Sequence, residues 1–265
     1  ILSRVNWKQT FVIHKLIYGK QSFTNITFNT QNKAGILSIA PIHAGINKGS
    51  VDASMSINAA SKRTAFQASL QVNRVPIAAF SPASRFQGKM NLQSRLSTQG
   101  ENQAAWLANL SGQGTMNIQQ GVLKGISLGH YIKQAQQMLH RNNDSATQES
   151  NDTAFQSLAA DYTIKQGSVH NDQLTITSGQ FNVLGNGVIG LASNDLRYHV
   201  MLVYTKGDKQ TRIPLIAQGS LNAPHISLDK QALLKIALED RAKKALGAKD
   251  GKKKFDLKKL FHKKW

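Results

Sequence analysis

The sequence predicts a mainly β protein, built as an antiparallel sheet with a few short helices and one helix near the C-terminus. Two observations predict this class. Apolar and polar residues alternate with a period of two in many short segments. Gly, Asn and Asp recur between these segments roughly every 8–20 residues, the spacing of hairpins and meanders. Such short gaps leave no room for the crossover helices of an α/β fold.

The alternation is clearest in residues 51–58, 66–72 and 90–96, each of which carries its apolar residues on one side. Shorter pairs, Met116 with Ile118 and Leu174 with Ile176, continue the same pattern. Strands of this kind have one apolar and one polar face. Residues 198–204 are apolar on both faces, so we expect this strand to be covered on both sides.

Three stretches have helical rather than alternating spacing: residues 104–110, 129–141 and 230–246. Between the second and third helices, residues 142–152 are polar and predict a surface loop. We expect three regions: 1–84, N-terminal β repeats of one elongated sheet; 85–229, a β region with the inserted helix 129–141; and 230–265, a C-terminal helix followed by a basic tail.

Motifs for catalysis or cofactor binding are scarce. The chain has no Cys, its eight His residues form no metal-ligand spacing, and no paired-carboxylate motif stands out. The run Gly185-Asn-Gly-Val-Ile-Gly190 fits GxGxxG, but strand-like residues flank it, so we interpret it as a hairpin turn. We therefore expect no enzyme, no metal and no cofactor.

The C-terminal tail is the sharpest local signal. Residues 241–265 hold 11 Lys or Arg against Asp250 and Asp256, almost half of the net charge of +19. As a helix, the tail would place its leucine and aromatic residues on one face and its lysines around the other. This pattern favours an anionic membrane surface over nucleic acid, and a solubilising tail is the third alternative. The predicted contacts are Lys252, Lys253, Lys254, Leu257, Lys258, Lys259, Leu260, Phe261, Lys263, Lys264 and Trp265.

Three blocks of the chain resemble the AsmA family of bacterial envelope proteins. Residues 110–128 (LSGQGTMNIQQGVLKGISL) are similar to its "LxGxGxxxxxxGxxxGxxL" block, with Ser127 where an Asp is more usual. Residues 153–158 with 164–169 resemble its "TxFxxL…xxxxG" block. Residues 185–191 with 214–224 resemble the glycine-rich block at the end of the family's pattern. We interpret these glycines as strand ends, with Pro224 closing a strand at an edge. The resemblance is best over about 85–230 and looser over 1–80.

The resemblance implies a Gram-negative envelope protein with its body in the periplasm, an inner-membrane anchor upstream of Ile1, and a role in outer-membrane biogenesis. The family's larger members look like bridge-like lipid conduits, with an open, curled, half-barrel-like sheet whose apolar inner face carries acyl chains. The implied partners are phospholipid or another acyl-chain lipid, an anionic membrane surface and an envelope protein.

We therefore predict that the alternating apolar residues line a lipid groove. Core packing against the helices is the alternative for each position. A scaffold for outer-membrane protein assembly without lipid cargo is the alternative function. Nucleic-acid binding through the tail is a second alternative. The predicted lining residues are Val51, Ala53, Met55, Ile57, Phe66, Leu70, Val72, Met90, Leu92, Leu96, Met116, Ile118, Leu174 and Ile176.

Overall fold

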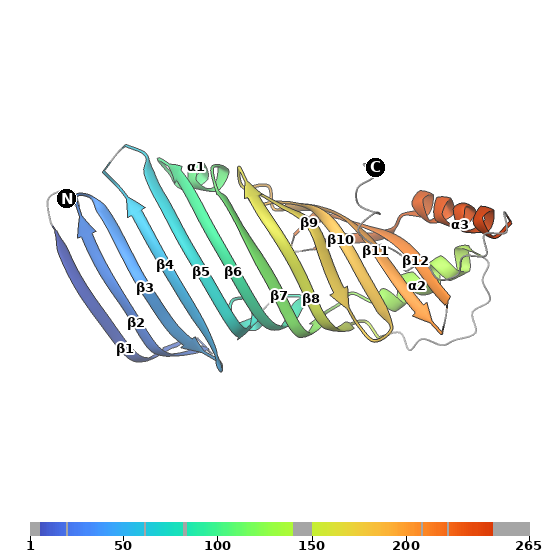
Figure 1. Cartoon of the computed structure of the whole chain (residues 1–265), viewed down its shortest axis with the longest axis horizontal. Coiled ribbons are helices and arrows are strands. Elements are labelled where there is room, and N and C mark those ends of the chain that lie inside the picture. Colours follow the sequence, from blue (N-terminus) through green and yellow to red (C-terminus); the bar gives the residue numbers. More distant parts are fainter. Residues whose placement is uncertain are drawn as a thin grey trace.

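The computed structural model describes residues 6–19, 21–60, 62–81, 84–139, 150–207, 209–221 and 223–245. These residues form one 13-stranded sheet in which every strand pairs antiparallel with its neighbours in the sequence. The order of the strands in Figure 1 is thus the order of the chain. The predicted mainly β fold, antiparallel and open, is confirmed. β5 pairs with β6, so the sheet continues without a break across the boundary expected near residue 84.

The elements follow one another as a long meander. They are β1 (Trp7–Tyr18), β2 (Gln21–Lys33), β3 (Ile36–Ile46), β4 (Gly49–Asn58), β5 (Thr64–Pro76), the 3₁₀ helix η2 (Ile77–Ala79), β6 (Phe86–Gly100), α1 (Gln103–Ala108), β7 (Ser111–Leu123), α2 (Leu128–Met138), β8 (Thr153–Lys165), β9 (Ser168–Thr177), β10 (Phe181–Gly190), β11 (Asp195–Lys206), β12 (Lys209–Ser220), β13 (His225–Leu228) and α3 (Lys230–Ala245).

The three predicted helices are present as α1, α2 and α3, and their ends differ from the predicted ones by at most three residues. α1 begins at Asn102, whose side chain accepts a hydrogen bond from the Ala105 amide. Ser127 caps α2 in the same way. In the family pattern this position is more usually Asp, and a serine hydroxyl performs the same capping role. Residues 142–149, most of the polar loop predicted over 142–152, lie outside the described residues.

The expectation that the block glycines end strands is wrong for most of them. Gly112, Gly114 and Gly121 lie inside β7, and Gly185 and Gly187 lie inside β10. The GxGxxG run is likewise no hairpin turn, because β10 continues through it with a register irregularity between Gly185 and Gly187. The physical reason is close packing, since a Cβ on each of these glycines would meet a side chain or the backbone of a neighbouring strand.

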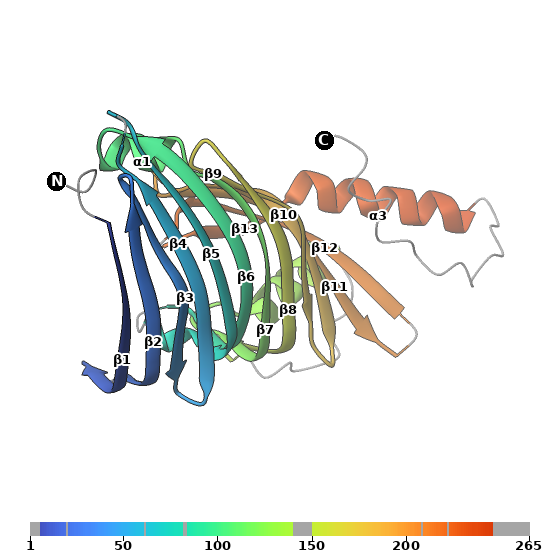
Figure 2. The ribbon, with the colours of Figure 1, turned by 60° about the vertical axis from the view of Figure 1, so that its left-hand side comes forward.

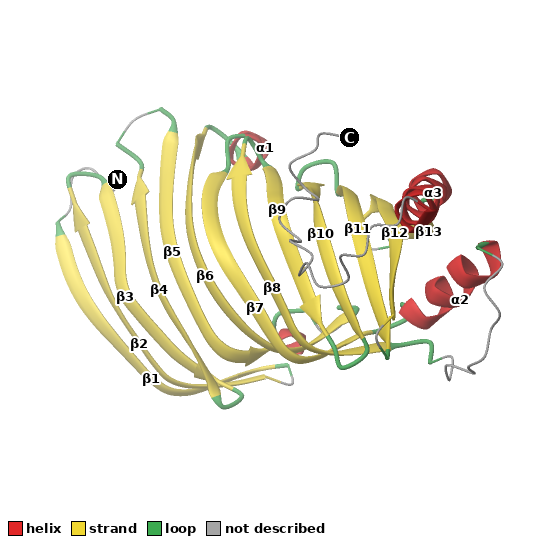
Figure 3. Cartoon of the chain, turned by 45° about the vertical axis from the view of Figure 1, so that its right-hand side comes forward, coloured by secondary structure: helices red, strands yellow, loops and turns green. Residues whose placement is uncertain are grey.

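The strands are bowed along their length, which gives the sheet its curled shape (Figure 2). The sheet does not close, because β1 and β13 each pair with one strand only among the described residues. α2 and α3 lie together at the C-terminal end of the sheet, next to β12 and β13 (Figure 3).

α3 covers an edge that would otherwise be open. β13 is short and pairs only with residues 215–218 of β12, so the first half of β12 has no strand beyond it in the described structure. α3 packs beside this half, where the Arg212 guanidinium lies 2.6 Å from Asp240 of α3. A helix placed over a strand edge blocks unwanted pairing with another chain.

Candidate functional site: the apolar face of the sheet

One face of the sheet carries apolar residues in rows that cross the strands. The longest row joins directly opposed positions from β3 to β13, because the register keeps apolar residues opposite one another. Its members are Ala44, Val51, Val72, Leu92, Met116, Ala160, Leu174, Gly185, Val200, Leu215 and Leu228. We call the side of the sheet that bears this row the apolar face, and the opposite side the polar face.

The C-terminal part of the apolar face is a packed core. A second row, Met90, Ile118, Leu158, Ile176, Val183, Leu202 and Ile213, runs across β6 to β12 there. Leu128, Ile132 and Ala135 of α2, together with Leu233 of α3, bury these residues in one cluster. Leu158 and Ile213 are 1% and 0% exposed, so little of this part is open to a ligand.

Buried hydrogen bonds hold α2 on the sheet. The Thr153 hydroxyl, at the start of β8, accepts a bond from the Leu128 amide (3.0 Å) and donates one to the Ile126 carbonyl (2.6 Å). The Tyr131 hydroxyl donates to the Ile226 carbonyl of β13 at 3.1 Å. Burial raises the pKa of the Tyr131 hydroxyl, so the neutral, donating form is favoured.

Farther toward the N-terminus, few side chains from outside the sheet cover the apolar face. α1 reaches the apolar face at one point, where the Trp106 ring packs edge-on against Phe66 with ring centres 4.8 Å apart. A small cluster of Ile46, Val72 and Val75 is buried beside η2. Other apolar side chains there stay half-buried and belong to neither buried cluster, among them Ala53, Met55, Ile57 and Leu96.

All fourteen residues predicted to line a groove lie on the apolar face. Val72, Ile118 and Ile176 are buried in the two clusters, and the other eleven are half-buried. The structure thus brings the predicted set together as one surface, part packed and part open. The eleven predicted membrane contacts of the tail, from Lys252 to Trp265, lie outside the described residues.

The prediction missed much of the packed end. Val183, Leu202 and Ile213 were not proposed, although they continue the second row. Strict alternation is lost around them because both faces are buried there: Leu202 is 0% and the adjacent Val203 is 6% exposed. At this pair β11 is buried on both faces, whereas His199 in the same segment is exposed. An apolar run without alternation is the signal that could have found these residues.

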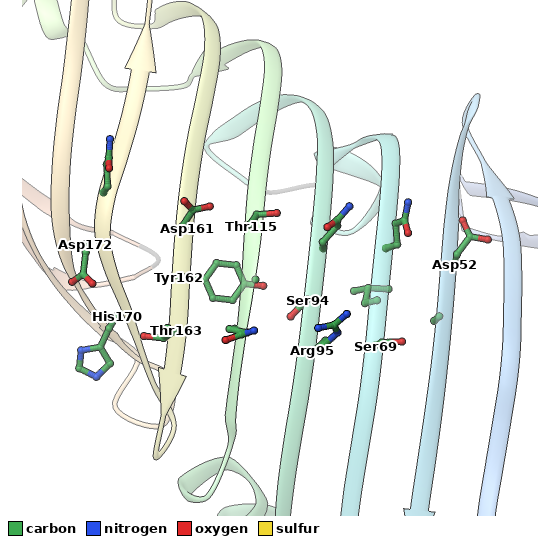
Figure 4. A pocket seen from close by; sticks show the side chains of 17 residues that line it. Asp52, Ser69, Ser94, Arg95, Thr115, Asp161, Tyr162, Thr163, His170 and Asp172 are labelled. Carbon is green, nitrogen blue, oxygen red and sulfur yellow. The ribbon is translucent and has the colours of Figure 1, made fainter. Parts of the chain in front are cut away.

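The polar face carries a hollow of about 820 Å³ over β4 to β9 (Figure 4). One of its rows, Asp52, Gln71, Gln93, Thr115, Asp161 and Gln173, joins opposed positions across six strands. Arg95, Thr163 and His170 line it further. Among the described lining residues, no hydroxyl is hydrogen-bonded to a histidine or a carboxylate. This surface is hydrated and of mixed charge, so it does not suit an acyl chain.

None of the helices in the described ranges is both long and apolar enough to cross a membrane. Within the same ranges, no three histidine or acidic side chains gather in a way that could hold a metal ion.

Comparison with known proteins identifies the family to which the chain belongs. The model of the AsmA family matches residues 6–174, so the match reaches farther toward the N-terminus than the glycine blocks indicate. The chain is also similar to Protein AsmA of Escherichia coli (strain K12), at 26% identity over 261 residues. That alignment covers 91% of this chain but only 42% of the length of the relative. No solved structure matches the chain with significance. With a family match over more than half of its residues, and with the open β-sheet described above, this chain belongs to the AsmA family.

Proposed function

We propose that this chain binds phospholipid acyl chains along the open part of its apolar face, as the non-enzymatic body of an envelope protein in outer-membrane biogenesis. The observation that carries the proposal is the half-buried set Ala53, Met55, Ile57 and Leu96, which continues the apolar face beyond the residues that α2 and α3 cover. An apolar surface that the protein's own helices leave open suits an apolar ligand.

Apolar burial would supply the binding energy. Each methylene group removed from water contributes about 0.8 kcal/mol, so about ten fully shielded methylenes supply the roughly 8 kcal/mol of micromolar binding. The twelve steps from β1 to β13, at about 4.8 Å each, give the sheet a length on the order of 58 Å. Binding makes and breaks no covalent bond.

The packed cluster under α2 and α3 gives the apolar face a closed end. Because Leu158, Leu202 and Ile213 are already covered, acyl chains would lie on β4 to β7 rather than on β9 to β12. The headgroups would remain in water at the rim of the bowed strands, since no apolar surface can replace their hydration.

Lipid extraction and native mass spectrometry of the purified chain test the proposal. The expected result is copurifying phospholipid that a fluorescent fatty acid displaces. The double substitution M55Q/L96Q should weaken binding of the fluorescent fatty acid at least about tenfold, because it adds polar groups to the open part. Q71E/Q93E on the polar face is the matched control and should bind normally. A chain that carries no phospholipid and binds no fatty acid would rule out the lipid proposal.

We further propose that this body lies on the periplasmic side of a Gram-negative envelope. Family membership supports an envelope location, and the polar face is compatible with an aqueous compartment on that side of the sheet. Two reporters fused in turn after residue 265 test the location, one that is active only in the periplasm and one that is active only in the cytoplasm. The periplasm-specific reporter should be active and the other should not. Activity of a cytoplasm-specific reporter at the same point would contradict it.

A scaffold function is the second candidate, and the edge strand β1 favours it. Phe11, Val12, Ile17 and Tyr18 are all exposed on this strand, which pairs only with β2 in the described structure. A strand edge with exposed apolar side chains can accept a further strand, from a partner protein or from the same polypeptide. Substituting Val12→Lys and Ile17→Lys together should abolish capture of an envelope partner while fatty-acid binding persists, if this function applies. Retention of the partner by that variant would argue against it.

A further inference from the structure

α3 uses one of its faces to pack on the sheet. Leu233 and Ile236 are 1% and 8% exposed, and Asp240 on the same side pairs with Arg212 of β12. The Asp229 carboxylate caps the helix by accepting a hydrogen bond from the Ala232 amide at 3.0 Å. The orientation of α3 is therefore fixed by contacts on one side and at its first turn.

The opposite side of α3 carries two leucines that touch no buried cluster. Leu234 is 47% and Leu238 is 64% exposed. Residues four positions apart lie one above the other on a helix, so the two side chains form one apolar strip. Single exposed leucines are common on protein surfaces, but a strip on a helix that has already buried its other face needs a separate explanation.

Basic residues border this strip. At 3.6 residues per turn, Lys230 and Arg241 lie along one side of Leu234 and Leu238, and Lys235 lies along the other. All three are exposed, and Lys230 and Arg241 form no ion pair with the described residues. The exposed acid Glu239 lies at the margin, beyond Lys235. The outer face of α3 is thus apolar along its middle and positively charged along its margins.

We propose that this outer face is a docking surface for an anionic lipid bilayer. A helix that lies in a membrane interface inserts its leucines to the level of the acyl chains and keeps its lysine and arginine side chains at headgroup depth. Charge complementarity selects an anionic bilayer. The sequence that follows α3 continues the same chemistry, since residues 246–265 contain eight lysines, two aspartates and three aromatic residues, the C-terminal tryptophan among them. The phosphates of duplex DNA would bind the basic residues, but they offer no apolar surface for the exposed leucines.

This docking surface is separate from the apolar face, so the two proposals fail independently. In this arrangement the bilayer would meet the closed, C-terminal end of the sheet, beside the edge of β12 that α3 covers.

Vesicle sedimentation of the full chain tests this proposal. The probes are vesicles of phosphatidylcholine alone and of phosphatidylcholine with about one-third phosphatidylglycerol. We expect binding only to the anionic vesicles, and L234S/L238S should weaken it at least about tenfold. The control is Leu221→Ser, an equally conservative change at a leucine that is 41% exposed in the turn before β13, and it should bind normally.

A charge-reversal variant, K230E/R241E, should reduce binding to anionic vesicles to the level seen with neutral ones. Both double variants should keep the parent's circular dichroism and fatty-acid binding. Three results would overturn the proposal: anionic-vesicle binding that survives L234S/L238S, binding that only removal of residues 249–265 abolishes, or duplex DNA binding that the leucine substitutions leave unchanged while vesicles do not bind.

Discussion

Gly121 of β7 lies directly opposite Phe155 of β8, and the Phe155 ring lies over it. The same relationship joins Gly114 to Tyr162 and Gly187 to Tyr198, again as directly opposed residues of neighbouring strands. An aromatic side chain can fold across the sheet at these points because its partner has no Cβ. Three of the glycines in the blocks that resemble the AsmA family are therefore packing positions inside strands.

Gly121→Ala should destabilise the fold by about 1–3 kcal/mol, because the new methyl group would displace the buried Phe155 ring. Urea unfolding followed by circular dichroism measures the loss. Gly179→Ala is the control, since a Cβ at that turn meets no atom within 4 Å. Equal stability of the two variants would contradict the packing role of Gly121.

The two parts of the apolar face should respond differently to truncation. Leu202→Ala, in the packed cluster at 0% exposure, should cost about 2–5 kcal/mol of unfolding free energy. Leu96→Ala, in the open part, should cost no more than about 1–2 kcal/mol because its side chain is already half in water. Denaturant titration of both variants checks this. A similar loss at both positions would mean that the face is packed throughout.

Thr153→Val should loosen α2, because it removes the hydroxyl that serves both the Leu128 amide and the Ile126 carbonyl. The expected loss is about 1–3 kcal/mol, since a buried amide is left without its acceptor. Hydrogen exchange of the α2 amides should rise in this variant. It should not rise in Thr163→Val, an exposed position on the polar face of the same strand. Unchanged exchange in both would refute the anchoring role of Thr153.

The stability of the fold should depend on pH through Asp152, whose ion pair with Lys124 joins the end of β7 to the start of β8. The Lys124 ammonium, at 2.6 Å, and the Gly125 amide, at 2.9 Å, hold the pKa of Asp152 below its usual value. A lowered pKa in the folded state means that the stabilisation is present above the pKa of the unfolded chain and is lost as pH falls through the folded pKa.

Asp152→Asn should therefore lower the thermal midpoint at neutral pH, and its difference from the parent should shrink as the pH falls below the usual Asp pKa of about 3.9. Thermal unfolding at a series of pH values measures this. Asp172→Asn is the matched control, because it replaces an exposed carboxylate on the polar face. Its thermal midpoint should stay close to that of the parent throughout the series. A difference for Asp152→Asn that stays constant with pH would contradict the ionic role of Asp152.

The sequence predicted well whatever depends on local periodicity. Residues 51–58 and 66–72 alternate strictly, so their apolar sides could be assigned before the partner strands were known. Helical spacing identified α3 for the same reason. The inner and outer sides of α3 could not be assigned, because leucines occur on both and only the packing of Leu233 distinguishes them. The role of Gly121 was also hidden, since it depends on the register that places Phe155 opposite.

The polar hollow could not be predicted either. Its row from Asp52 to Gln173 comes from six strands that span more than a hundred residues, and a one-residue slip in any pairing would remove it. The packed end was missed because β10 to β12 are buried on both faces and lose alternation there.

Site-specific photo-crosslinking tests the central proposal most directly. A photoreactive p-benzoylphenylalanine would replace Leu96 in the open part of the apolar face, or Arg95, its neighbour on the polar face, in cells that express the chain. Binding of acyl chains by the apolar face predicts covalent phospholipid at position 96 and none at position 95. Equal labelling at the two positions, or none at position 96 in a folded chain, would contradict it.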